Sequence, residues 1–202
     1  MIRVLTAGDE VQITELWQEA FGDGAEEIHA FLAAMTGETV GLGLFADGAL
    51  QSQLFILPGE LTCGAEVLPA GYVCAVATRR AGQGKNYASR LLESAREYGA
   101  KRSLAGLVLY PASESLVGFY AKRGYAPAFC ATHFFAPPAP AFVWTENLRP
   151  LLRTMCDGFA EEGVGLDSSH LTQPGMLLPL NAQGKAWLEA NGGKAQLAHP
   201  LD

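Results

Sequence analysis

The sequence predicts an α/β (α+β) fold in which a mixed sheet carries helices on both faces. Segments with strand and helix patterns follow one another in the order β-α-α-β-β-β-α-β-α-β. Two of the strand segments, 72–78 and 105–110, are almost continuously apolar, as is typical of strands buried on both faces. Because 49% of the 202 residues are hydrophobic, the chain can bury one generous core but not two full domains.

The first quarter of the chain is predicted to contain a strand and two helices. A strand at 2–5 precedes a helix that begins at Asp9-Glu10 and ends at Gly22-Asp23-Gly24. Spacings of three and four residues place one apolar set on a single side of this helix: Val11, Ile13, Leu16, Trp17 and Phe21. A second helix, which ends near Gly37, repeats this spacing at Ile28, Phe31, Leu32 and Met35.

Strands dominate the next part of the chain. Three are predicted, at 40–45, at 50–57 and near Leu61 and Val67. Asp47-Gly48 between the first two is a typical hairpin turn. A fourth strand at 72–78, after Pro69-Ala70-Gly71, leads into a helix at 87–98 with Gly99 just past its end.

The second half begins with a strand at 105–110 that stops at Pro111. Ser113 is placed to cap the following helix, which Gly124 terminates. A further strand is predicted at 129–135, before a proline-rich break. In the last third, helices are predicted at 148–159 and 183–190. Short apolar runs lie at 176–180 and 195–197.

Charge is distributed unevenly along the chain, whose net charge is −7. Residues 1–78 contain eleven acidic residues and one basic residue, whereas 79–123 contain nine basic and three acidic residues. Nucleic-acid binding requires a broad positive face, so this pattern argues against it. A small polyanionic ligand at the basic segment and a cationic partner near the acidic segment fit better. The alternative is that these charges only solvate the surface.

Cysteine spacing and hydropathy limit the class of protein that the sequence can represent. Four cysteines lie far apart, at Cys63, Cys74, Cys130 and Cys156. Reduced thiols in a cytoplasmic protein are therefore expected, with no metal site and no disulfide framework. No signal peptide is recognised, and no apolar run approaches the roughly 20 residues that cross a bilayer, so no membrane is expected as a partner.

The stretch ATRRAGQGKNYASRLLESA, residues 77–95, suggests a phosphate-binding loop that precedes a helix. One frame is Arg79-x-x-Gly82-x-Gly84, and the other is Gln83-x-x-Asn86-x-Ala88. The first frame leaves no residue for the chain to turn after the strand. The second leaves a connection of ordinary length and sets the motif directly before the periodic helix, so it is preferred.

Strand 76–78, a short link and Gln83-Gly84-Lys85-Asn86-Tyr87-Ala88 resemble the acyl-CoA loop of the GNAT superfamily of N-acyltransferases. The family pattern is Gln or Arg, two residues, Gly, one residue, then Gly or Ala. Asn86 stands where the inner glycine is expected, and asparagine tolerates left-handed backbone angles.

A second motif strengthens the resemblance. After the next strand, the family has a helix opened by a polar residue, a tyrosine seven positions later, and Gly-Phe or Gly-Tyr. Ser113, Tyr120 and Gly124-Tyr125 match this pattern, with Ser113 in place of the usual asparagine. The resemblance covers roughly residues 1–135, and the N-terminal half is also similar to the acyltransferase domain of enhanced-intracellular-survival-type proteins.

The resemblance implies a mixed, mostly antiparallel sheet with a central parallel, splayed strand pair. It also implies a GNAT-like domain at 1–140 and a C-terminal extension at 141–202, packed on the same domain. Three roles stay open for the extension: it could cover the substrate, mediate homodimerisation, or be a remnant of a second domain.

The resemblance implies acetyl-CoA as acyl donor and assigns two kinds of site residue. Tyr120 would be catalytic and protonate the departing thiolate, although a core tyrosine is the plain alternative. The donor-binding residues would be Val76, Ala77, Thr78, Gln83, Gly84, Lys85, Asn86, Tyr87, Ala88, Ser89 and Ser113. Backbone groups at 76–78 would polarise the thioester, and amides of the loop, with Lys85 and either Arg80 or Arg90, would bind the diphosphate.

The general base is left open by the sequence. Candidates are His133, Glu60, Glu66 and the chain terminus at Asp202. Cys74 suggests a covalent acyl carrier, but no Cys–His–acid pattern supports that role, and a buried core thiol is preferred.

Two functional classes follow. The first is an N-acyltransferase in which a primary amine of a small molecule or peptide, expected to be cationic, attacks acetyl-CoA directly in a ternary complex. The alternative is a catalytically weak or inactive CoA-binding module, motivated by Asn86 and Ser113. A dinucleotide-binding fold is disfavoured, because the first strand lacks the glycine-rich turn of such a site.

Overall fold

The computed structural model describes residues 1–34, 37, 39–130, 139–144 and 173–197. The chain divides into two compact units that share long strands. The first unit comprises residues 1–57 and 73–98, and the second comprises 58–72 and 99–202. The predicted helix at 148–159 and the base candidates His133 and Asp202 lie outside the described residues.

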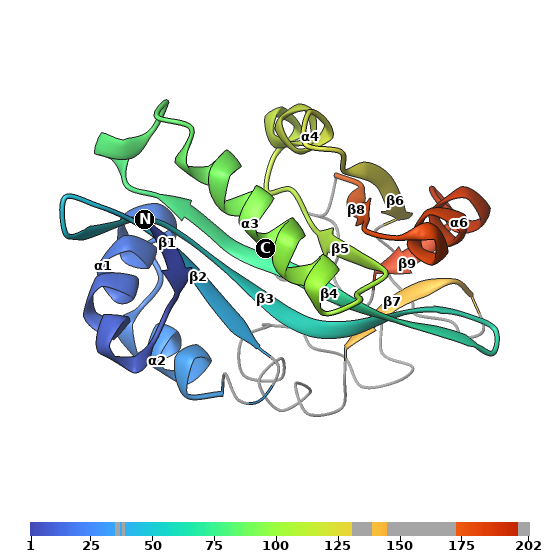
Figure 1. Ribbon diagram of the computed structural model, residues 1–202, viewed down its shortest axis with the longest axis horizontal. Coiled ribbons are helices and arrows are strands. Elements are labelled where there is room, and N and C mark those ends of the chain that lie inside the picture. The colour runs from blue at the N-terminus through green and yellow to red at the C-terminus, as the bar shows by residue number, and fades with distance from the viewer. Residues whose placement is uncertain (35–36, 38, 131–138, 145–172, 198–202) are drawn as a thin grey trace. The chain divides into compact units, whose positions relative to one another are not determined.

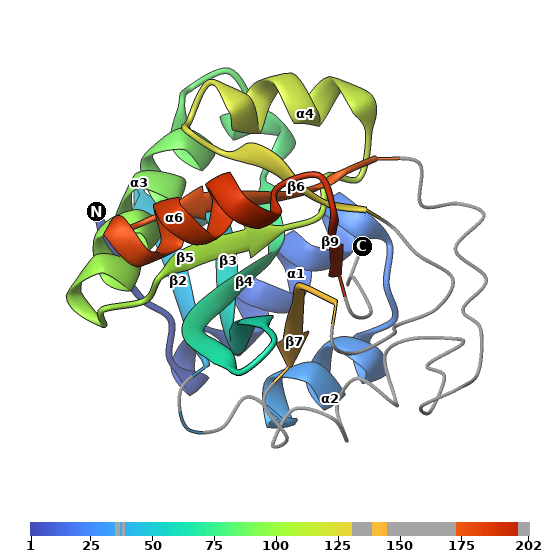
Figure 2. The ribbon, with the colours of Figure 1, turned by 90° about the vertical axis from the view of Figure 1, so that its right-hand side faces the viewer.

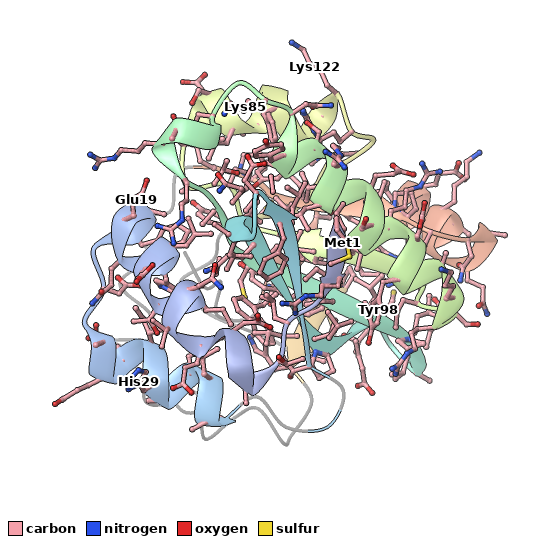
Figure 3. The ribbon with its side chains drawn as sticks, turned by 60° about the vertical axis from the view of Figure 1, so that its left-hand side comes forward. Met1, Glu19, His29, Lys85, Tyr98 and Lys122 are labelled. Carbon is pink, nitrogen blue, oxygen red and sulfur yellow. The ribbon has the colours of Figure 1, made fainter. Side chains whose placement is uncertain are left out.

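The first unit is an antiparallel sheet with helices on both faces (Figure 1, Figure 2 and Figure 3). Its strands are β1 (Ile2–Val4), β2 (Val40–Ala46), the first part of β3 (Ala49–Cys63) and the last part of β4 (Glu66–Thr78). The helices α1 (Glu10–Phe21) and α2 (Ala25–Ala34) lie on one face, and α3 (Tyr87–Lys101) lies on the other. The predicted hairpin at Asp47-Gly48 is confirmed, since β2 pairs with β3 around it.

An aromatic cluster joins α1 and α2 to the sheet of the first unit. Trp17 lies 5.0 Å from Phe31 and 5.6 Å from Phe55, measured between ring centroids. The prediction that Val11 and Phe21 share the buried side of α1 is wrong, because they are 70% and 46% exposed. A helix turns about 100° per residue, which places Val11 opposite the buried stripe and Phe21 at its edge.

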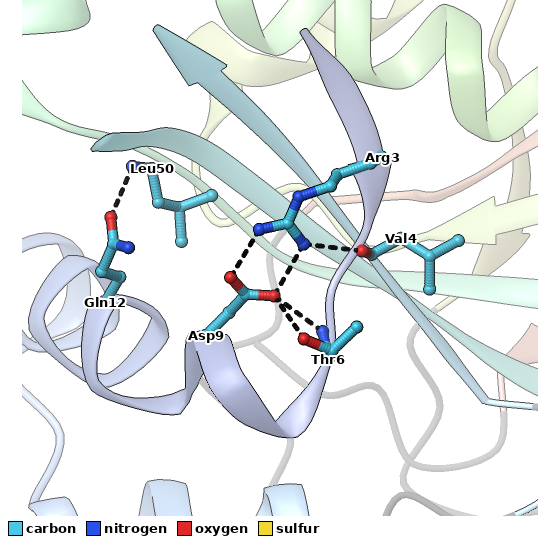
Figure 4. Close-up of polar contacts among 6 residues, drawn as sticks. All are labelled: Arg3, Val4, Thr6, Asp9, Gln12 and Leu50. Carbon is cyan, nitrogen blue, oxygen red and sulfur yellow. Dashed lines mark hydrogen bonds and ion pairs between the residues drawn. The ribbon is translucent and has the colours of Figure 1, made fainter. Parts of the chain in front are cut away.

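A buried carboxylate ties β1 to the start of α1, after a short 3-10 turn at Ala7–Asp9 (Figure 4). Asp9 accepts two hydrogen bonds from the Arg3 guanidinium, at 2.6 and 2.7 Å. It also accepts hydrogen bonds from the backbone N–H and the hydroxyl of Thr6, both at 2.9 Å. The hydrogen bonds from Arg3 lower the pKa of Asp9 well below its usual range. Burial acts in the opposite direction and raises this pKa, whereas the hydrogen bonds from Thr6 lower it further.

The stability of the folded protein at acid pH should depend on the ionisation of Asp9. Because the pKa of Asp9 is lowered on folding, its stabilising effect is complete above the ordinary aspartate pKa of about 3.9 and disappears as the pH falls further. We expect Asp9→Asn to lower the Tm at pH 7 by roughly a few degrees. The difference from wild type should shrink in thermal scans between about pH 4 and pH 2. A difference that is constant over this range would contradict the assignment.

The second unit contains a closed ring of strands. Its further strands are β5 (Gly106–Leu109), β6 (Ala126–Cys130), β7 (Ala141–Trp144), β8 (Gly175–Pro179) and β9 (Ala195–Leu197). Neighbours follow the order β3-β4-β5-β8-β6-β9-β7, and β7 pairs back onto β3. The pairs β4–β5, β6–β9 and β7–β9 are parallel. The pairs β1–β2, β2–β3, β3–β7, β5–β8 and β6–β8 are antiparallel.

This pairing confirms the predicted mixed sheet with a parallel pair at its centre. The parallel ladder of β4 and β5 joins Ala70, Gly71 and Tyr72 to Gly106, Leu107 and Val108, while β4 continues to Thr78. The described part of the second unit also contains the helices α4 (Glu114–Ala121) and α6 (Ala182–Asn191). The helix predicted at 183–190 is confirmed by α6, and the apolar runs noted at 176–180 and 195–197 form the strands β8 and β9.

Three predicted boundaries are wrong. No separate strand begins near Leu61, because β3 continues to Cys63 and turns at Gly64, whose φ is +60°. The prediction that Gly99 follows α3 also fails. This glycine lies inside α3, which continues to Lys101, and the left-handed residue after the helix is Ser103. A Cβ at Gly99 would come within 2.6 Å of a methyl group of Leu180.

The third wrong boundary concerns β6, which spans Ala126–Cys130 rather than beginning at Phe129. Pro127 opposes Met176 of β8, so a proline is accommodated within this strand next to an irregularity in the register. The rest of the predicted strand, 131–135, lies outside the described residues.

The described residues of segment 141–202 contribute the strands β7, β8 and β9 to the ring. Strand β8 lies between β5 and β6, and β7 lies between β9 and β3. None of the helices in the described part of the chain combines the length and apolar character needed to span a bilayer.

Candidate active site

In the first unit, β4 leads through a short 3-10 turn (Arg80–Gly82) and a loop into α3. Two residues of this loop have left-handed backbone angles, Gly84 with φ +77° and Asn86 with φ +63°. Asparagine is among the few residues that adopt this conformation readily, which is the conformation expected for it from the sequence. No heavy atom lies within 4 Å of the position that a Cβ of Gly84 would occupy. The loop is therefore open to a ligand at Gly84.

The spacing of the two left-handed residues bears on the reading frame. A glycine, one residue and a second special backbone position occur at Gly84, Lys85 and Asn86. The family pattern has a Gln or Arg three residues before its first glycine. If Gly84 is that glycine, the position of the Gln or Arg is Ala81. Both this frame and the one preferred from the sequence keep these three residues in the loop.

Backbone amides of the loop divide into two sets. Those of Gly82, Gln83 and Lys85 donate within the turn, to the carbonyls of Arg79, Arg80 and Gly82 at 2.8, 3.3 and 3.3 Å. Among the described residues, no backbone acceptor is found for the amides of Gly84, Asn86, Tyr87 and Ala88. They lie at the N-terminal end of α3, where the helix dipole favours negative charge. The end of this helix is thus arranged as an anion site.

Basic residues lie next to this anion site in the sequence. Arg80, Lys85 and Arg90 are exposed, and Figure 3 shows Lys85 at the same end of the first unit as Glu19 of α1. Arg79 is different, because its guanidinium is bound by carboxylates of α1. Arg79 is therefore engaged elsewhere, which argues against a phosphate frame that begins with it.

The end of β4 is distorted just before the residues predicted to contact the acyl group. Ala75 has φ +47°, an unusual conformation for alanine and most unusual within a strand. Beyond it, Ser52 of β3 donates a hydrogen bond to the carbonyl of Ala77 at 2.7 Å and pairs with the Thr78 hydroxyl at 2.8 Å. These contacts hold the last residues of β4 against β3, next to the loop.

Tyr120 lies in the second unit, at the C-terminal part of α4. Its side chain is 7% exposed, with ring neighbours Phe119 at 5.2 Å and Tyr125 at 5.7 Å. Burial raises the pKa of Tyr120 to about 12, and the nearby Arg123 opposes the shift. The phenol is therefore protonated at every physiological pH and is available as a proton donor.

A second buried tyrosine lies beside the first. The hydroxyl of Tyr125 is buried and has no hydrogen-bond partner among the described residues. Burial, with a smaller effect from Tyr120, raises the pKa of Tyr125 far above its usual value. Arg123 lies 3.5 Å from the centroid of the Phe119 ring and donates to the carbonyl of Phe119, so it braces the end of α4.

Ser113 occupies the N-cap position of α4, as predicted, but its side chain does not cap the helix. Its hydroxyl instead pairs with the hydroxyl of Ser115 at 2.9 Å. The structure thus places the predicted donor-binding residues 76–78 and 83–89 together in the first unit, whereas Ser113 and Tyr120 share α4 in the second unit.

The other candidates from the sequence, Glu60, Glu66 and Cys74, lie in strands of the sheet. Glu60 is part of β3, opposite Val143 of β7, and Glu66 is exposed at the start of β4. Burial raises the pKa of the Cys74 thiol to about 12, so it carries no thiolate at neutral pH and is unsuited to a covalent acyl carrier. Sequence reasoning missed Glu15 and Glu19, because their contacts with Arg79 join residues about sixty positions apart.

Comparison with known families matches residues 1–128 to the acetyltransferase (GNAT) domain. Comparison with curated proteins finds no match. Among solved structures, the GNAT family N-acetyltransferase YhbS from Escherichia coli, in complex with CoA, aligns with a TM-score of 0.63 and 14% identity. The alignment covers 98% of this chain and 89% of that chain, so it includes most of the last third, which the sequence motifs left unassigned.

Two further structures extend this comparison. A GNAT family acetyltransferase from Brucella melitensis, in complex with acetyl-CoA, has a TM-score of 0.56 and 18% identity over 73% of this chain and 97% of that chain. Eis1 from Mycobacterium abscessus has a TM-score of 0.53 and 18% identity over 64% of this chain and 31% of that chain. The chain spans about a third of the length of Eis1, and the same holds for two other solved structures that it matches. At these identities the likeness shows the fold alone.

Proposed function

The chain belongs to the GNAT acetyltransferase family, and on this premise we propose that it transfers an acetyl group from acetyl-CoA to a primary amine. The amine is carried by a small molecule or a peptide. The observation that carries this proposal is the anion site at the start of α3, where the amides of Gly84, Asn86, Tyr87 and Ala88 have no backbone acceptor among the described residues. We also propose a cytoplasmic location, as the scattered cysteines of the sequence suggest.

The loop residues fit a diphosphate. Among the described residues, four backbone amides of this loop have no backbone acceptor and no heavy atom lies within 4 Å of the Cβ position of Gly84, while Lys85 adds a flexible positive charge. Two structures with the same fold are complexes with CoA or acetyl-CoA, which supports acetyl-CoA as donor. Acetyl-CoA supplies a thioester whose carbonyl carbon an amine can attack.

The reaction that we propose is direct transfer in a ternary complex. The neutral amine nitrogen forms a bond to the acetyl carbon, the bond from that carbon to sulfur breaks, and the nitrogen loses one proton to a base. Tyr120 donates its phenolic proton to the leaving sulfur and regains a proton from solvent. Because burial raises the pKa of Tyr120 to about 12, the donor form is always populated at neutral pH.

We propose a cationic acceptor, and the charges of α1 and α2 support it in part. Arg79 binds both Glu15 and Glu19, so its single positive charge offsets one of their two negative charges. Glu10 pairs with His29 at 3.6 Å, and the remaining acidic residues on this helix pair and its connection are Asp23, Glu26 and Glu27. They leave an uncompensated negative charge that would attract an ammonium group over several ångströms.

Two measurements test the proposed function. Calorimetric titration with acetyl-CoA should show binding, and a panel of primary amines should include at least one that releases the CoA thiol from acetyl-CoA. Cationic amines should give the higher kcat/KM. Binding without turnover on any amine would favour the inactive CoA-binding module, and a titration without heat or shift in Tm would refute the proposal altogether.

A further inference from the structure

A network of hydrogen bonds joins α1 to the point where the chain leaves β4. Arg79, the first residue after β4, donates through Nε to the carbonyl of Leu50 at 2.9 Å, and its backbone N–H donates to Gln51 at 2.9 Å. Its two terminal nitrogens donate to Glu19 at 3.2 Å and to Glu15 at 3.0 Å. Arg79 therefore links β3, β4 and α1 within the first unit.

Glu19 holds this junction at two points. One carboxylate oxygen accepts from the Arg79 guanidinium, and the other accepts from the backbone N–H of Arg80 at 2.7 Å. The Glu19 side chain is 28% exposed, whereas that of Glu15 is 58% exposed and has the single contact with Arg79. Glu19 is thus the better shielded carboxylate, and the one that binds the backbone itself.

The junction is continuous with the anion site. Hydrogen bonds from Gly82 to Arg79, from Gln83 to Arg80 and from Lys85 to Gly82 run through the turn without a gap. A shift of the Arg80 backbone would therefore change the direction of the amides at Gly84 and Asn86. Anion binding by amides depends on that direction, because hydrogen bonds weaken steeply when misaligned.

We propose that Glu19 is a positioning residue for the diphosphate-binding loop: it fixes the first turn after β4 and so orients the amides that receive the donor. This inference rests on the proposed function. Glu19 touches neither the donor nor the reacting atoms, and its effect passes through Arg79 and Arg80.

The test compares donors with and without a diphosphate. S-acetylpantetheine carries the same thioester as acetyl-CoA but lacks the diphosphate. We expect Glu19→Ala to raise the KM for acetyl-CoA and the calorimetric Kd for CoA about tenfold, the scale of one charged hydrogen bond. The kcat/KM with S-acetylpantetheine should stay unchanged. Glu19→Gln, which keeps an acceptor for the Arg80 amide, should recover part of the loss.

Glu10→Ala is the matched control, because Glu10 lies on the same helix and its ion-pair partner is His29, at 3.6 Å. It should leave both donors unaffected. Equal losses with acetyl-CoA and S-acetylpantetheine, or no loss with either, would overturn the inference for Glu19. If Glu19→Ala does not fold, the same comparison is made with Glu19→Gln. Failure of the wild-type protein to bind CoA would instead overturn the proposed function, and this inference with it.

Discussion

Replacing Tyr120 with phenylalanine is expected to lower kcat by about 10²-fold or more while leaving the calorimetric Kd for CoA within about twofold of wild type. The substitution removes the hydroxyl that donates a proton to the leaving sulfur, and keeps the ring that contacts Phe119 and Tyr125. Because the side chain is 7% exposed and its shape is retained, the protein should fold as before. The measurement is steady-state release of CoA thiol.

Tyr125→Phe is the matched control for this experiment. Tyr125 is 3% exposed and lies beside Tyr120, and its hydroxyl has no partner among the described residues. Its loss should leave kcat unchanged and should not lower the Tm, since a buried hydroxyl without a partner contributes nothing to stability. Equal losses in the two variants would show that the region responds to any change, and would remove Tyr120 from the mechanism.

The pH profile provides a second test of the same residue. A proton donor is active below its pKa and is lost as the pH rises through it. Burial raises the pKa of Tyr120 to about 12, so the donor form persists well above the ordinary tyrosine value of about 10. The wild-type kcat should therefore show no alkaline loss up to about pH 10. A fall with an apparent pKa near 8 would assign the proton donor to another group.

Local patterns predicted the loop well, because its conformation depends on neighbours in sequence. Gly84 and Asn86 adopt positive φ, and the helix that follows begins where the periodicity indicated. The strand β7 was not predicted, because it is only four residues long and is defined by pairing with β3 and β9. A pairing between distant segments leaves little mark on local composition.

The misplacement of Gly99 has a similar cause. A glycine near the end of a helical pattern usually marks a C-cap, because it adopts left-handed angles at little cost. Here the glycine is needed for close packing against Leu180, which lies about eighty residues later in the chain. The carboxylates of α1 that hold Arg79 were missed for the same reason, since they looked like ordinary solvated charges.

Another tightly packed glycine leads to the prediction with the largest expected effect on stability. Gly184 lies in the first turn of α6, and a Cβ there would come within 1.8 Å of the carbonyl oxygen of Ala105 and 2.7 Å of its carbonyl carbon. That carbonyl accepts a hydrogen bond from Leu180 at 2.9 Å, and the Ala105 amide donates to Pro69 at 2.7 Å. The backbone of Ala105 therefore cannot move away from α6 without breaking these bonds.

Gly184→Ala should therefore destabilise the protein by about 3 kcal/mol or more, despite the gain of about 1 kcal/mol that alanine usually brings within a helix. For a chain of this size, the loss corresponds to a fall in Tm of roughly 6–12 °C. Gly118→Ala is the matched control, because Gly118 lies within α4 and no heavy atom lies within 4 Å of its Cβ position. It should raise the Tm slightly. If both substitutions move the Tm upward in thermal unfolding, α6 does not pack on Ala105 as closely as the structure indicates.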